Sequence, residues 1–90
     1  MGTTIGNIMI SYDVRNFHVE VKRDLVALGY FDYFTFDNGA TRYELPNTTL
    51  WHHSKSSDQA MSDMIAVTTR LRATLEKAVA VKASEFVGYR

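Results

Sequence analysis

The order in which hydrophobic patterns follow one another constrains the fold of this chain more than any other feature of its sequence. Residues 7–13 contain the unbroken apolar run from Ile8 to Ile10, which is typical of a central strand covered on both faces. Between 17 and 28, apolar residues recur at spacings of four, four and three, as on one face of a helix. Residues 30–36 are dense in aromatic side chains, which favours a strand. The first part of the chain therefore predicts a strand, a helix and a second strand.

The remainder of the chain predicts a third strand, a second helix and a fourth strand. The third strand is expected at 47–53 and the fourth at 76–82, where Val79 and Val81 alternate with Ala78 and Ala80. The second helix is expected to begin at Ser56, because Ser56 and Gln59 have the spacing of a capping box, with Ser57 as an alternative cap. The expected apolar stripe of this helix consists of Met61, Met64, Ile65, Thr68, Leu71 and Leu75.

This order of elements predicts an α+β domain of the ferredoxin-like βαββαβ type, spanning residues 1–90. Such a fold has a four-stranded antiparallel sheet with two helices on one face, and 90 residues are enough for one domain of this kind. The second face of the sheet would be bare, and a large exposed apolar face is typical of an interaction site. A homodimer formed through the sheet is therefore expected.

Several residues indicate where these elements end. Asn16 is the expected N-cap of the first helix, and Gly29 is expected just after its last turn. The segment Asp37-Asn38-Gly39 predicts a turn. The following residues, 40–46, are loop-like, although 41–45 could extend as an edge strand.

Charge and cysteine content exclude several classes of protein. Ten Lys and Arg residues balance ten Asp and Glu residues, so the chain lacks the basic excess of a dedicated nucleic-acid binder. Cysteine is absent, which excludes disulfides and thiolate metal sites. No apolar run approaches the roughly 20 residues of a membrane span, and the start lacks a signal-peptide pattern. We expect a cytoplasmic protein that does not bind membranes.

The end of the chain is unusually apolar for a free terminus. Phe86, Val87 and Tyr89 lie within the last five residues, and free ends fray unless they are docked. We therefore expect 85–89 to pack as an additional C-terminal strand, along the edge of the partner's sheet, with Gly88 relieving crowding there.

Three short segments resemble a known group of small proteins. Residues 8–14, which read Ile-Met-Ile-Ser-Tyr-Asp-Val, are similar to the first strand of the Cas-two-like proteins, which ends in an aromatic-Asp pair. Residues 25–30 resemble the end of the first helix in that group, with its Leu-Gly-aromatic sequence. Residues 84–89 resemble the ending of its SinR-like members. The group also includes the CRISPR adaptation protein, the VapD-type ribonucleases and the antitoxin ribonuclease GhoS.

The resemblance implies a function for Asp13. In the group, the aspartate that ends the first strand faces its twin across the dimer axis and acts as the metal-binding and catalytic residue, which carried over is Asp13. Two such carboxylates would hold Mg²⁺ for metal-dependent cleavage of RNA by an endoribonuclease of a CRISPR-associated or toxin–antitoxin system. The chain departs from the CRISPR protein after Asp13, where Arg15 and His18 stand in place of a run of basic residues.

The candidate residues also have simpler interpretations. Asp13 could order the turn between strand and helix through nearby amides. Arg15 and His18 are candidates for phosphate contact or for acid–base catalysis, and the alternative is a solvated start of the first helix. The sequence thus leaves two functions open: a Mg²⁺-dependent endoribonuclease, and a non-catalytic dimeric module that binds RNA, DNA or a protein partner.

Two further features invite a functional interpretation. His52 and His53 look like a metal pair, but neighbours on a strand point to opposite faces, so one is expected beside the core and one in solvent. Trp51 and the aromatic residues of 30–36 could stack on RNA bases. Because basic residues are not interleaved with them, a place in the core or in a dimer interface is the preferred interpretation.

Overall fold

The computed structural model describes residues 2–36 and 41–83 of the chain. Its elements are β1 (Gly6–Val14), α1 (His18–Ala27), β2 (Tyr33–Phe36), β3 (Thr41–Glu44), β4 (Thr49–Lys55), α2 (Ser57–Leu71) and β5 (Leu75–Lys82). The turn predicted at 37–39 and the strand predicted at 85–89 lie outside the described residues. The two helices and four of the strands occupy segments for which the sequence predicts those structures.

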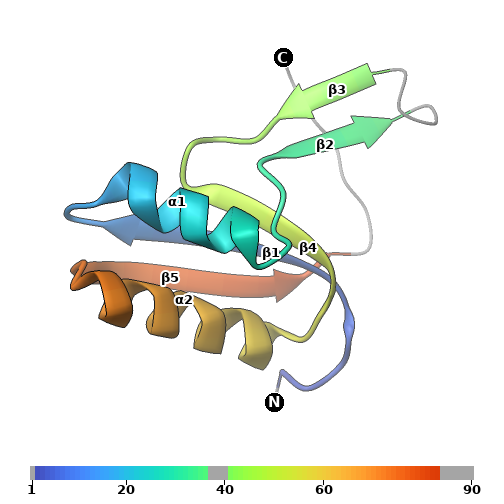
Figure 1. The fold of residues 1–90 in the computed structure, drawn as a ribbon. Helices are drawn as coiled ribbons and strands as arrows, with labels where there is room; N and C mark the ends of the chain where they lie inside the picture. The colour runs from blue at the N-terminus through green and yellow to red at the C-terminus, as the bar shows by residue number, and fades with distance from the viewer. Residues whose placement is uncertain (1, 37–40, 84–90) are drawn as a thin grey trace.

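Strand β1 is the centre of a three-stranded sheet. The strand order is β4-β1-β5 and both pairings are antiparallel, with Ile10 opposite Leu50 on one side and opposite Ala80 on the other. Helices α1 and α2 lie on the same face of this sheet (Figure 1). The central position of β1 is as predicted, but its burial alternates residue by residue, because the helices cover one face only.

The predicted four-stranded sheet differs from the sheets that the described residues form. Within those residues, β2 pairs with β3 in a separate two-stranded sheet, from Tyr33 opposite Glu44 onward. A single antiparallel bridge joins Phe31 to Trp51 of β4, through backbone hydrogen bonds of 2.8 and 3.1 Å. One residue later, the carbonyl of Asp32 already accepts from the β3 side, so the predicted 30–36 strand divides between two partners. The part of the chain that the structure describes is therefore a small α+β fold with two helices.

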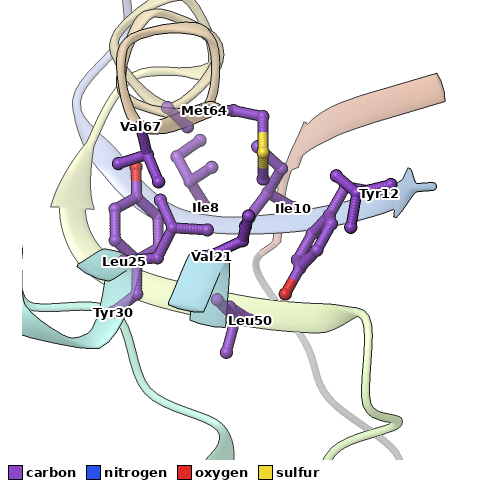
Figure 2. Close-up of a cluster of buried hydrophobic side chains, with 11 residues drawn as sticks. Ile8, Ile10, Tyr12, Val21, Leu25, Tyr30, Leu50, Met64 and Val67 are labelled. Atoms are coloured by element: carbon purple, nitrogen blue, oxygen red, sulfur yellow. The ribbon is translucent and has the colours of Figure 1, made fainter. Parts of the chain in front are cut away.

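The core lies between the helices and the covered face of the three-stranded sheet. Every second residue of β1 points into it, while α1 and α2 contribute residues spaced three or four apart. Figure 2 shows these side chains converging between the elements. The cluster consists of Ile8, Ile10, Tyr12, Val14, Val21, Leu25, Tyr30, Leu50, Ala60, Met64 and Val67.

The helix ends confirm two predictions and correct one. Ser56 and Gln59 form the predicted capping box, with hydrogen bonds of 3.1 and 2.9 Å. Gly29 follows α1 with a φ of +98°, as the prediction requires. Asn16, however, is not the N-cap of α1. Its side-chain oxygen accepts from the backbone N–H of Thr74, 2.9 Å away, and Phe17 occupies the cap position without a side-chain hydrogen bond.

The buried face of α2 is rotated from the predicted stripe. Met64 and Thr68 are buried as predicted, but Ile65 is 52% exposed. Ala60 and Val67 complete the buried face instead. The predicted member Leu75 belongs to β5 rather than to the helix. Because successive helical residues point about 100° apart, Met64 and Ile65 cannot both face the centre of the core.

Candidate functional site on the open sheet face

On one face of the three-stranded sheet, the described residues place no helix, and this face is called the open face here. The residues of β1, β4 and β5 that alternate with the core residues lie on it in cross-strand rows. Its members are Met9, Ser11, Asp13, Thr49, Trp51, His53, Lys77, Val79 and Val81. Of the four predicted strands, the three that correspond to β1, β4 and β5 therefore form this surface.

The β5 side of the open face is apolar and exposed. Val79 and Val81 are 55% and 50% exposed, although Ala78 and Ala80 between and beside them pack against the core. In the same cross-strand row as Val79, the hydroxyls of Ser11 and Thr49 lie 3.4 Å apart. The uncharged centre of the face thus borders directly on exposed valines.

The β4 side of the open face is covered in part by aromatic rings. The Trp51 ring lies 5.0 Å from that of Phe31 and 5.4 Å from that of Phe34, measured between centroids. The indole N–H of Trp51 donates to the carbonyl of Tyr33 at 2.6 Å. These contacts attach the β2–β3 hairpin to the sheet. This arrangement supports the structural interpretation of the aromatic residues over base stacking.

Asp13 lies near the end of β1, at the border of the open face. Its side chain is exposed, and Lys77 stands opposite on β5. Both residues line a hollow of about 370 Å³ together with Val79. The candidate metal ligand is therefore next to the exposed apolar surface.

Arg15 and His18 have different surroundings from Asp13. The Arg15 guanidinium, whose side chain is 72% exposed, pairs with the Glu76 carboxylate at 3.1 Å. His18 is the first residue of α1 and lines a different pocket, on the helix side of the protein, with Lys22. The structure thus does not gather the three candidates into one cluster. Across residues 2–36 and 41–83, no group of three or more His, Asp or Glu residues is placed to hold a metal ion.

The two adjacent histidines occupy different environments, as predicted. His52 is nearly buried, with its ring 5.1 Å from that of Tyr30, whereas His53 is exposed. The Nδ1 atom of His52 accepts from the backbone N–H of Ser54 at 3.0 Å. Burial lowers the pKa of His52, and the positive charges of Lys55 and His53 lower it further. His52 is thus a neutral core histidine.

A network of polar side chains on the helix side was not predicted from the sequence. One carboxylate oxygen of Asp63 accepts from the Tyr30 hydroxyl at 2.9 Å and from the Lys55 ammonium at 2.7 Å. Burial and the bond to Asp63 raise the pKa of Tyr30. The three residues come from α2, β4 and the segment before β2, so only the folded chain brings them together.

Comparisons with protein-family models, curated proteins and solved structures found no match to this chain. Neither of the helices in the described part of the chain is long and apolar enough to cross a membrane. The described residues therefore define a small α+β protein whose three-stranded sheet has helices on one face, and the resemblance to the Cas-two-like group stays a prediction.

Proposed function

We propose that two copies of this chain associate through their open faces, as a twofold homodimer of the Cas-two-like type. The observation that carries the proposal is the half-exposed pair Val79 and Val81 on an uncovered sheet face. Exposed apolar surface of this kind is removed from water when a second copy covers it. The antiparallel bridge between Phe31 and Trp51 supports a ferredoxin-like arrangement, in which the chain around Phe31 takes the place of the fourth strand.

The charges on the open face suit a contact between identical copies. Asp13 and Lys77 lie opposite each other on adjacent strands, so the border of the face carries one charge of each sign. A twofold interface must be self-complementary, because the same surface is used by both subunits. A symmetry axis close to the end of β1 would bring Asp13 towards its twin.

The proposed activity is metal-dependent cleavage of RNA at this axis. Two Asp13 carboxylates would hold Mg²⁺, a cation that prefers oxygen ligands. The ion would polarise a phosphoryl oxygen and lower the pKa of a bound water molecule. Arg15, the residue directly after β1, would contact phosphate only by exchanging its pairing with Glu76. His18 takes no part in this step, because it lines the pocket on the helix side.

The oligomeric state tests the interface. Light scattering after size-exclusion chromatography is expected to give a dimer for the native chain and a monomer for Val79→Lys. Ile65→Lys is the matched control, because Ile65 on α2 is 52% exposed and Val79 is 55% exposed. A dimer that survives Val79→Lys, or a monomeric native protein, would contradict the interface.

The catalytic part is tested separately with Asp13→Asn. Cleavage of single-stranded RNA is expected with Mg²⁺ or Mn²⁺ and is expected to be lost in Asp13→Asn, while Asp58→Asn on the exposed start of α2 retains it. Mg²⁺ is also expected to raise the melting temperature of the native dimer but not that of Asp13→Asn, since a ligand stabilises only the state that binds it. Cleavage that persists in Asp13→Asn would show that the site lies elsewhere.

The second candidate function is a non-catalytic dimeric module that binds a nucleic acid or a protein. The neutralised charges near Asp13 favour it: Lys77 stands opposite the carboxylate, and Arg15 is paired with Glu76. This function predicts the same dimer, disrupted by Val79→Lys, with no RNA cleavage under either metal ion. The two experiments above therefore distinguish the interface from the chemistry.

A further inference from the structure

A pocket of about 680 Å³ lies on the helix side of the sheet, and the open face lies on the other side. One wall is the outer side of α1, from His18 to Val26, and another is formed by Asn47 and Thr48 just before β4. Tyr12 adjoins this second wall, because its backbone N–H donates to the Thr48 carbonyl at 3.0 Å. The volume falls within the range of about 300–1,000 Å³ that is typical of small-molecule sites.

The hydroxyl of Tyr12 is a hydrogen-bond donor that remains available in this pocket. Tyr12 is only 5% exposed as a whole residue, and its hydroxyl makes no hydrogen bond to any group in the described part of the chain. Because that part of the chain holds no buried side-chain oxygen or nitrogen without a partner, the hydroxyl oxygen itself is in contact with solvent, which a ligand in the pocket would replace. Figure 2 shows this hydroxyl at the edge of the core cluster, directed away from Met64. Burial also raises the pKa of Tyr12, so the hydroxyl stays protonated and is available as a donor to a ligand.

The charged residues of the pocket favour an anion. Lys22 and Arg23 contribute two positive charges and Asp32 contributes one negative charge, and the Nε–H of Arg23 also donates to the Asp24 carboxylate at 3.0 Å. The Lys22 ammonium lies 3.6 Å from the Asp32 carboxylate, a distance that leaves it free to bind a second oxygen ligand. The imidazole of His18 is a further donor at the same wall.

The start of α1 adds to this preference. The helix has no side-chain cap, and its first backbone bond runs from the N–H of Val21 to the carbonyl of Phe17. The N–H groups of the first turn therefore lack partners within the helix, and they form the positive end of its dipole. His18 and Val19 of this turn line the pocket. Anions bind at such helix starts.

We propose that this pocket binds a small organic anion. One carboxylate or phosphate group contacts Lys22, Arg23 and the first turn of α1. The apolar body of the ligand packs against Val19 and Val26, and a polar atom of that body bonds to the Tyr12 hydroxyl. The site is separate from the open face and does not depend on the function proposed for Asp13.

Titration followed by ¹H–¹⁵N NMR tests the ligand class, with phenyl phosphate, benzoate, inorganic phosphate and phenol as probes. At least one of the two aromatic anions is expected to give saturable shifts at His18, Val19 and Thr48, and the tighter of the two identifies the preferred head group. Inorganic phosphate lacks the apolar body and phenol lacks the charge, so both are expected to bind at least about tenfold more weakly. Absence of saturable shifts with both aromatic anions, or shifts confined to Val79 and Val81, would overturn the proposal.

Two variants test the residues that define the site. Tyr12→Phe keeps the ring and removes a hydroxyl that has no hydrogen-bond partner among residues 2–36 and 41–83, so it is expected to fold normally and to bind the anion about three- to tenfold more weakly. Lys22→Gln is expected to weaken binding about tenfold. Tyr33→Phe and Lys77→Gln are the matched controls outside the pocket and are expected to bind like the native protein. Native affinity in both Tyr12→Phe and Lys22→Gln would refute this site.

Discussion

Removing the carboxylate of Asp63 is expected to destabilise the protein because it leaves a buried hydroxyl without its hydrogen-bond acceptor. Tyr30 is 1% exposed, and its hydroxyl donates to Asp63 across 2.9 Å. The same carboxylate oxygen accepts from Lys55 at 2.7 Å. Asp63 on α2 therefore anchors both the segment after α1 and the end of β4.

The size of the effect follows from these contacts. In Asp63→Ala, the Tyr30 hydroxyl stays buried without a partner, which costs about 1–3 kcal/mol. Loss of the partly exposed pair with Lys55 adds about 0.2–1 kcal/mol. Tyr30→Phe removes the hydroxyl itself and is expected to cost about 1 kcal/mol. In the double variant, Asp63→Ala adds only the small contribution of Lys55, because Phe needs no acceptor.

Urea unfolding followed by circular dichroism measures these differences in the free energy of unfolding. All variants are compared at one protein concentration, because the stability of the proposed dimer would depend on concentration. A loss of about 2 kcal/mol corresponds to roughly 8–16 °C in melting temperature for a chain of this size. The coupling between Tyr30 and Asp63 is expected to be about 1–2 kcal/mol. Strictly additive effects of the two substitutions would refute the reasoning.

Three further predictions concern local features of the chain. Burial lowers the pKa of His52 below its value of 6.5 in the unfolded chain, so its contribution to the free energy of unfolding is complete above that pH and is lost as the pH falls through the folded pKa. Urea titrations at several pH values are expected to give a shallower acid dependence for His52→Gln, and an identical dependence would contradict this assignment. Ser56→Ala is expected to lower the free energy of unfolding by about 1 kcal/mol, because the capping box loses its side-chain acceptor, and Ser57→Ala by much less. Equal losses in thermal melts would show that the cap is unimportant. Residues 84–90 form an apolar end of the sequence, and their deletion is expected to weaken the proposed dimer and lower its melting temperature. Light scattering that shows an unchanged dimer would rule out these residues as part of the interface.

The sequence alone determined the features that depend on neighbouring residues. The capping box at Ser56 and the glycine after α1 are set within a few residues, so they follow from local hydrogen bonding and backbone conformation. The central position of β1 follows from its apolar run. The opposite environments of His52 and His53 follow from strand geometry.

Other features depended on residues that are distant in the sequence, and only the tertiary structure decided them. Asn16 is not a helix cap because Thr74, far along the chain, takes its side-chain oxygen. The predicted second strand divides because Phe31 bonds to β4 while β2 bonds to β3. Asp13 and His18 are five residues apart in sequence, yet the turn between β1 and α1 places them in separate hollows. Which side chains meet depends on how the elements pack, and local sequence patterns do not specify that packing.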